Sequence, residues 1–262
     1  VSGTAPTEWV LVKINSGYVD FSVGGPYIIQ QNTGNDGFIW TKDWARSMGG
    51  HNTNQDYFNS VDTDADCNVV VGGYYNSAEN GKSGIVIKLD KDGVVLWQVA
   101  VDQGSDGFEV TGVKFDPSGN VIAFATQYDG NVWVYKLDGT TGEMIWHVSI
   151  GDGDLWNEPT SGLDVDAQGF IYVGGRYYNG YQCYADNFLV VKIDTNGGLV
   201  YMRDIGGIYN LYENYGDGNP HSSISVKNGR MSLCLGHSDI PGDDRYQASM
   251  ADLPADGSGH GN

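Results

Sequence analysis

Eight aromatic residues stand in segments that are rich in Asn, Asp and Gln, a combination suited to binding sugars. A tyrosine ring can stack on the apolar face of a sugar while Asn and Asp side chains hydrogen-bond the sugar hydroxyl groups. The candidate ligand-binding residues are Tyr74, Tyr75, Tyr128, Tyr177, Tyr178, Tyr181, Tyr184 and Trp156. The alternative interpretation is that these rings only pack between repeated units of the fold and bind no ligand.

Asp62, Asp64 and Asp66 alternate along the chain and place oxygen ligands as the start of a calcium loop does. A calcium loop also needs Gly at its sixth position and a carboxylate at its twelfth, where this sequence has Cys67 and Gly73. The corresponding segments of two later repeats are ordinary Asp/Gly turns. We therefore expect no cofactor, with calcium at the three Asp residues as the alternative.

An acidic residue beside an aromatic one recurs along the chain, as in Asp56 with Tyr57. Three glutamates of this set could serve as the paired carboxylates of a glycoside hydrolase. They are Glu109, Glu158 and Glu213. No two of them are singled out, and no Ser/His/Asp order, phosphate loop or paired-His metal motif is present. We therefore expect a protein without catalytic activity, whose acids bond to loop amides while the aromatic rings wedge between units.

Composition excludes several classes of partner. The chain has 262 residues, with 33 acidic against 14 basic side chains and a net charge of -19. This charge repels phosphate, which argues against nucleic acid and anionic membrane surfaces as partners. No apolar stretch approaches the roughly 18 residues that a membrane span needs, so no membrane insertion is expected. A hydrophobic fraction of 40% is enough to form a core.

The cysteines and the overall composition bear on location. Cys67, Cys183 and Cys234 form no C-x-x-C pair, so they indicate neither a zinc cluster nor a disulfide framework. Cys234 lies between two leucines and is predicted to be a core residue. The acidity, the abundant Tyr and Asn and the scarce Lys favour an extracellular, cell-surface or particle-surface protein. The first residues lack a signal-peptide pattern, so we expect that any signal has been removed.

Internal repetition is the strongest signal for the fold. Four segments each read as a short strand, an Asp/Gly or Asn/Gly turn and a second strand, which is a hairpin. These segments are residues 61–73, 113–123, 163–175 and 224–233. Asp64 and Asp116 hold the same place in the first two hairpins and are 52 residues apart.

Two further strands follow each of the first three hairpins. The alternation of β-branched or aromatic residues predicts a third strand at residues 85–90, 132–138 and 189–194. A Gly-containing turn then leads to a fourth strand at 94–97, 143–146 and 198–201. Four antiparallel strands per unit are typical of a β-propeller blade. The sequence therefore predicts a single all-β domain over residues 1–262 with about five blades, at approximately 1–50, 51–104, 105–153, 154–208 and 209–262.

The units resemble the bacterial β-propeller repeat family, related to the seven-bladed propeller repeat. Its blades read Asp-x-x-Gly-Asn-Val-Tyr-Val-x-Gly, then a Val-Lys-Leu-Asp strand, then Trp-x-x-x-x-Gly-Gly. The resemblance covers roughly residues 37–205. It implies a secreted or cell-surface protein used for binding or scaffolding, and it carries over no catalytic residues.

The two ends of the chain fit the repeat less well. Residues 37–42 and 44–50 read as a third and a fourth strand of a first blade, and residues 247–253 as the third strand of the last. We predict that residues 9–14 pair with 247–253 and close the ring, because closure removes exposed strand edges. The alternative is that residues 9–15, which resemble 188–194, belong to a longer array of repeats.

The sequence thus predicts a non-catalytic, extracellular or particle-surface propeller that acts as a structural, assembly or binding module. A carbohydrate-binding lectin is the second hypothesis, and a glycoside hydrolase the third. The expected partners are further copies of the chain, other extracellular proteins and neutral glycans.

Overall fold

The chain folds into β-strands joined by turns and loops. The computed structural model describes residues 9–15, 19–21, 29–31, 41–48, 56–77, 81–101, 107–127, 132–150, 162–178, 186–204, 223–238 and 246–258. Every regular element within these residues is a β-strand. The described residues contain no helix with the length and apolarity needed to cross a membrane.

Antiparallel sheets follow one another in chain order. Three of them have four strands each. The first contains β5 (Tyr57–Thr63), β6 (Val69–Ser77), β7 (Gly81–Leu89) and β8 (Val95–Ala100), and the second contains β9 (Phe108–Phe115), β10 (Val121–Gln127), β11 (Val132–Leu137) and β12 (Met144–Ile150). The third contains β13 (Gly162–Val165), β14 (Ile171–Tyr178), β15 (Asp186–Ile193) and β16 (Leu199–Asp204). A further sheet contains β17 (Ser223–Lys227), β18 (Arg230–Ser238) and β19 (Tyr246–Pro254). Near the N-terminus β1 (Trp9–Asn15) pairs with β4 (Thr41–Met48), and β2 (Val19–Phe21) pairs with β3 (Ile29–Gln31).

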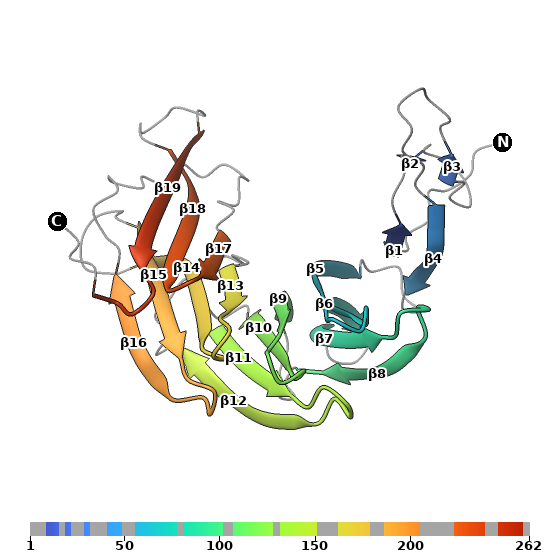
Figure 1. Ribbon diagram of the computed structural model, residues 1–262, viewed down its shortest axis with the longest axis horizontal. Helices are drawn as coiled ribbons and strands as arrows, with labels where there is room; N and C mark the ends of the chain where they lie inside the picture. Colours follow the sequence, from blue (N-terminus) through green and yellow to red (C-terminus); the bar gives the residue numbers. More distant parts are fainter. Residues whose placement is uncertain are drawn as a thin grey trace.

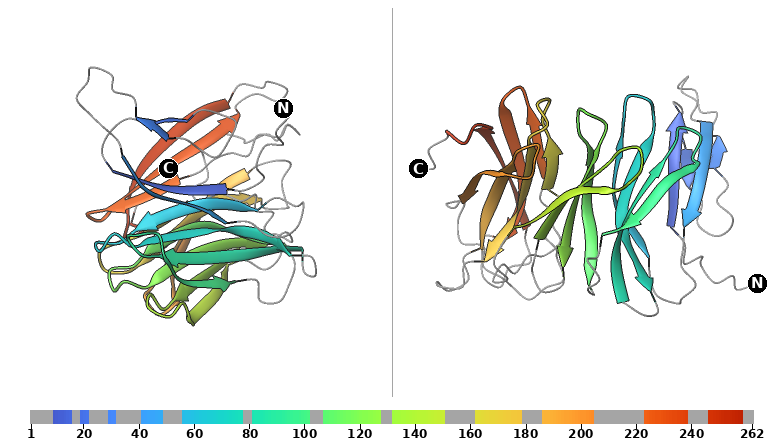
Figure 2. Two further views of the ribbon diagram at one scale, coloured as in Figure 1. Left: turned by 90° about the vertical axis from the view of Figure 1, so that its right-hand side faces the viewer. Right: turned by 90° about the horizontal axis from the view of Figure 1, so that it is seen from below.

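The sheets are arranged as the blades of a β-propeller. We name them blade I (β1 and β4), blade II (β5–β8), blade III (β9–β12), blade IV (β13–β16) and blade V (β17–β19). They follow an arc, with the first strand of blades II to V on the inner side and the strands β8, β12 and β16 on the outer side (Figure 1). Figure 2 shows the sheets side by side in chain order. The predicted all-β propeller fold is confirmed.

Each blade buries its faces against its neighbours. One apolar cluster joins blades II and III, another joins blades III and IV, and a third joins blades IV and V. The central strand β10 is buried on both faces from Val121 to Thr126, because blades II and IV cover it from the two sides. The core is therefore a series of blade interfaces, as expected for a repeat whose single unit cannot bury its own apolar surface.

The two ends of every sheet differ. Short turns join the first strand to the second and the third to the fourth, so these turns lie together at one end, which we call the turn end. The connections from the second strand to the third, and from one blade to the next, lie at the opposite end, which we call the loop end. The alternating strand direction of an antiparallel sheet produces this division.

An aromatic residue of each outer strand covers a turn of the next blade. Trp44, Trp97, Trp146 and Tyr201 occupy this position, and the glycines beneath their rings are Gly93, Gly142, Gly197 and Gly257. The Trp97 indole donates a hydrogen bond of 3.2 Å to the carbonyl oxygen of Gly139 in that turn. The other three rings donate to the carbonyl oxygens of Lys91, Thr195 and Ala255. We call this repeated feature the aromatic–turn contact.

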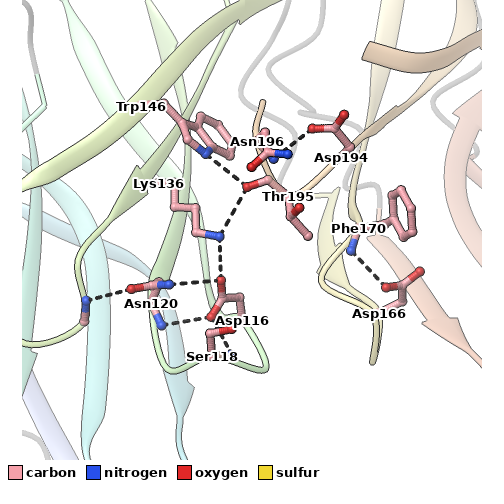
Figure 3. Close-up of polar contacts among 11 residues, drawn as sticks. Asp116, Ser118, Asn120, Lys136, Trp146, Asp166, Phe170, Asp194, Thr195 and Asn196 are labelled. Carbon is pink, nitrogen blue, oxygen red and sulfur yellow. Dashed lines mark hydrogen bonds and ion pairs between the residues drawn. The ribbon is translucent and has the colours of Figure 1, made fainter. Parts of the chain in front are cut away.

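A lysine of the third strand reinforces the contact in three blades. The Nζ atoms of Lys88, Lys136 and Lys192 donate to the same carbonyl oxygens of Gly139, Thr195 and Ala255. Figure 3 shows Lys136 and Trp146 of blade III meeting at Thr195 of blade IV. Each lysine stands opposite the aromatic residue in the register of the third and fourth strands, which is why both reach one atom.

The predicted ring closure is wrong. β1 pairs with β4, in a register that places Lys13 opposite Trp44, and β19 pairs with β18. The register of β1 and β4 matches that of the third and fourth strands of blade II, where Lys88 stands opposite Trp97. β1 and β19 thus both occupy the third-strand position of a blade, so neither supplies the missing fourth strand of the other. They lie at opposite ends of the arc (Figure 1).

Two other sequence predictions need correction. The strand in the third-strand position beside β4 is β1, whereas the sequence pattern predicts this strand at residues 37–42. Thr41 and Lys42 belong to β4 itself, and residues 37–40 lie outside the described residues. Cys234 is exposed and not a core residue. It follows the buried Leu233 in β18, and alternate residues of a strand face opposite sides.

We predict that glycine at position 142 is needed because of the ring above it. A Cβ added there would lie 2.8 Å from Trp97, whereas one added at Gly119 has nothing within 4 Å. Both glycines have positive φ, so alanine has the same backbone cost at either position, about 1–2 kcal/mol. Gly142→Ala should therefore lower the free energy of unfolding more than Gly119→Ala, as measured by urea denaturation followed by circular dichroism.

The same comparison in the Trp97→Ala background tests the cause. There the two glycine substitutions should have equal costs, because the ring is gone. A Gly142→Ala cost that stays larger in this background would contradict the prediction.

Candidate functional site

Polar and aromatic side chains gather at the loop end of the interface between blades II and III. We call Tyr57, Asn59, Tyr74, Lys82 and Glu109 the loop-end cluster. Tyr57 and Tyr74 stand opposite each other at the paired ends of β5 and β6, and their ring centroids are 5.2 Å apart. Lys82 enters from β7 and Glu109 from β9 of the next blade.

Charge holds the two blades together at this point. Lys82 Nζ lies 2.8 Å from Glu109 Oε2 and 3.9 Å above the centroid of the Tyr74 ring. Asn59 Nδ2 donates to Glu109 Oε1 at 2.9 Å and to the carbonyl oxygen of Val110. The lysine, its carboxylate and the ring therefore form one connected group of ion-pair and cation–π contacts.

The Tyr74 hydroxyl is held in its neutral form. Burial is the largest cause that raises its pKa, to about 12, and the negative charge of Glu109 adds to it. A phenol with this pKa is a hydrogen-bond donor at neutral pH and not a nucleophile. The group can therefore offer a donor to a ligand hydroxyl, which suits binding more than acid–base chemistry.

The candidate tyrosines divide by their position. Tyr74 and Tyr75 both lie at the end of β6 and are half-buried, but as consecutive strand residues they face opposite sides of the sheet. Tyr177 and Tyr178 lie at the end of β14, where their backbones pair with Asn187 and Asp186. The register places Tyr177 at the position in blade IV that Tyr75 holds in blade II. Tyr128, Tyr181, Tyr184 and Trp156 lie outside the described residues.

Two of the acids that stand beside aromatic residues, Asp56 and Glu109, are described by the structure, and both bond within the fold. Asp56 Oδ1 accepts a hydrogen bond from the Asn76 backbone amide at 3.0 Å. Phe108 is fully buried in the apolar cluster that joins blades II and III, and so wedges into the blade interface. Glu109, one of the three glutamates considered for hydrolysis, is bound by Lys82 and Asn59. Glu158 and Glu213 lie outside the described residues.

The candidate calcium ligands point to separate partners. Asp64 Oδ1 accepts hydrogen bonds from the backbone amides of Asp66 and Asn68. Asp62 Oδ2 accepts one from the Phe115 amide of blade III, at 2.8 Å. No group of three or more acidic, His or Cys side chains fit to hold a metal ion occurs among the described residues. The structure thus uses Asp62 and Asp64 in the turn and in the blade interface.

Asp116 and Asp166 form the same turn as Asp64. Each accepts two backbone amides through one carboxylate oxygen. Asp116 also forms a buried ion pair with Lys136, at 2.9 Å, with side chains 3% and 11% exposed (Figure 3). Cys67 takes the left-handed position, φ 64°, that Gly119 and Gly169 hold in the other two turns.

Sequence reasoning did not find Lys82 and Asn59. Their contacts with Glu109 join residues 27 and 50 positions apart, between two blades. The position of Lys82 at the start of a third strand, at the loop end, is a signal that could have placed it near Glu109. No pattern in the sequence indicates the pairing itself.

Comparisons with known proteins find distant likenesses in structure. No protein-family model matches the sequence, and no curated protein matches it. BamB from Moraxella catarrhalis is similar with a TM-score of 0.45 and 16% identity, over 87% of this chain and 64% of that chain. The N11 neuraminidase-like protein of A/flat-faced bat/Peru/033/2010 (H18N11) has a TM-score of 0.48 and 12% identity, over 82% and 64%. The chain thus spans less than two thirds of the length of either protein.

We predict that Asp116→Asn destabilises the protein more than Asp64→Asn. Asparagine keeps an oxygen that can accept the turn amides in both cases, but at position 116 it leaves the Lys136 charge buried without its carboxylate. Breaking a buried ion pair typically costs about 3–5 kcal/mol, whereas the Asp64 change should cost about 1 kcal/mol or less. Urea denaturation of both variants checks this, and equal costs would contradict it.

A second prediction concerns high pH. Because the folded-state pKa of Tyr74 is raised to about 12, above the usual value near 10, its contribution to stability is complete below pH 10. That contribution is lost as the pH rises from 10 through 12. The Tyr74→Phe variant should therefore lose less stability than the wild type over this range, as measured by thermal midpoints at each pH. Parallel curves for the two proteins would show that Tyr74 titrates normally.

Proposed function

We propose that the protein is a non-catalytic binding module, in which the propeller is a rigid scaffold and the loop end carries the ligand surface. The observation that supports it most is the division of polar groups between the two ends. At the turn end the aspartates are bonded to the amides of their own turns. At the loop end half-buried tyrosines accompany a lysine that is 36% exposed.

Neutral glycans are the ligand class we propose. The Tyr74 ring has Lys82 over one face and Tyr57 beside it, so its role is to hold the loop-end cluster and offer its hydroxyl. Tyr75, on the other side of β6, is the ring we assign to stacking on a sugar, together with Tyr177 at the equivalent position of blade IV. The net charge of -19 disfavours sulfated or phosphorylated glycans.

Binding is expected to be weak at each site and to rely on several blades. A stacked aromatic pair adds about 1 kcal/mol beyond the area it buries, and sites on one rigid scaffold can act together on a branched or repeating glycan. Such a ligand also fits the location predicted from composition, outside the cell or on a particle.

The test compares Tyr75→Ala, Tyr177→Ala and the double variant on a glycan array. Each single change should lower the signal of neutral glycans several-fold, and the double change should lower it further. Thermal midpoints should change little, because these residues lie at strand ends. Circular dichroism spectra that match the wild type serve as the control for folding.

Two results would overturn the proposal. Unchanged glycan signals in the double variant would show that these rings do not bind sugar. Release of reducing sugar from a bound glycan would instead assign the protein to the glycoside hydrolases.

Assembly with further copies remains a second candidate. It is supported by β19, which pairs with β18 on one side while no described strand pairs with its other side. A free strand edge can be satisfied by a second chain. Light scattering that shows only monomer at high concentration would contradict this candidate.

A further inference from the structure

The outer strands of the blades are free on one side. β8, β12 and β16 each end their sheet on the outer side of the arc and pair with one described strand only (Figure 1). Such an edge presents unpaired backbone N–H and C=O groups. Soluble proteins usually protect it with charged side chains, proline or a bulge that turns it away.

β8 and β12 lack the usual charged protection. Neither contains Lys, Arg, Asp, Glu or Pro, although the chain as a whole has 47 such charged residues. The outer strand β16 carries Arg203 and Asp204, and β4 carries Lys42, Asp43 and Arg46. All four outer strands have a register shift near their start, where one extra residue forms a bulge, at Leu96 in β8 and at Ile145 in β12. β8 and β12 differ from the other two in carrying no charge, and beyond the bulge their edges, residues 97–100 and 146–150, are open to a further strand.

Apolar side chains accompany these two edges. Val95 and Leu96 of β8 are 40% and 51% exposed, and Met144 and Ile145 of β12 are 47% and 50% exposed. Each pair lies at the bulge, where the regular alternation of side chains is interrupted, and places exposed apolar side chains beside the start of the open edge. A strand added at the edge would cover part of these side chains.

The charge beside these edges argues against a second copy of this chain. The turn that precedes β8 contains Asp90, Asp92 and Lys91, which is paired with Asp92, and the turn that precedes β12 contains Asp138 and Glu143, so both turns are acidic on balance. Two chains with a net charge of -19 each would bring like charges together at such an interface. A partner with basic residues where it passes the turn has the complementary charge.

We propose that the outer edges of β8 and β12 each accept an extended segment of a partner protein by β-strand addition. The segment alternates apolar residues with uncharged or basic ones. Backbone hydrogen bonds provide the attachment, and contacts with Val95, Leu96, Met144 and Ile145 select apolar side chains. This site is separate from the loop-end surface and does not depend on glycan binding.

The probe is a fluorescein-labelled peptide of nine residues, with Val at even positions and Lys or Thr at odd positions. We expect saturable binding with two peptides per chain. Leu96→Lys and Ile145→Lys should each remove one of the two sites, and the double variant should bind at least tenfold more weakly. Val61→Lys is the matched control, because Val61 is 55% exposed but lies on the inner strand β5. It makes the same change of charge and should leave peptide binding intact.

Hydrogen exchange identifies the mode of binding. The outward backbone amides of β8 and β12 should exchange more slowly in the complex, while those of β16 should not change. A peptide with N-methyl groups at alternate residues cannot donate to the edge and should not bind. Circular dichroism spectra that match the wild type would confirm that the lysine variants are folded.

Four results would each overturn the proposal. They are the absence of saturable binding to the wild type, binding that persists in the double variant, equal binding of the N-methylated peptide, and dimerisation of the wild type that the double variant loses. The last result would assign the two edges to a second copy of the chain.

Discussion

The aromatic–turn contact is the interaction on which the rest of the fold depends. A four-stranded blade exposes apolar residues on both faces, and the described core consists of clusters shared between neighbouring blades. The contact fixes the orientation of the next blade, because the ring needs a glycine beneath it and a carbonyl oxygen at its polar edge. The lysine of the third strand then supplies a charged donor to the same oxygen. The ring, the glycine and the lysine thus specify the orientation of a blade, in addition to the burial of its apolar surface.

The middle of the fold could be predicted from the sequence, because local pattern and tertiary structure agree there. In blades II to IV the alternation of apolar residues, the Asp/Gly turns and the Lys in the third strand all indicate the same four strands. The prediction failed at the first blade because residues 37–42 have the same β-branched and aromatic character as a true third strand. The choice between them and β1 is made by pairing, and Lys13 opposite Trp44 repeats the pairing of the other blades. The ring closure failed for the same reason, since it treated β1 as an outer strand.

For the candidate site, the types of residue could be predicted from the sequence, but the contacts between them could not. The sequence placed tyrosines and acids in the loops between strands, whereas the structure has Tyr57, Tyr74 and Glu109 within the ends of β5, β6 and β9, where they lie together. Lys82 and Asn59 complete the group through contacts that cross a blade interface, and such contacts leave no pattern along the chain. For Cys234, a local pattern in the sequence was misleading. Its apolar neighbours indicated burial, but strand alternation places it on the exposed side of β18.

The direction of the aromatic–turn contact has an evolutionary consequence. In blades II to IV the outer strand donates a ring to the following blade, while the turn of the same blade receives the ring of the preceding one. A gene duplication that copies such a blade would therefore add one donor and one acceptor at the same time. The number of blades in this architecture can change in whole units without leaving a turn carbonyl unpaired, and only the blades at the two ends of an array need specialised sequences.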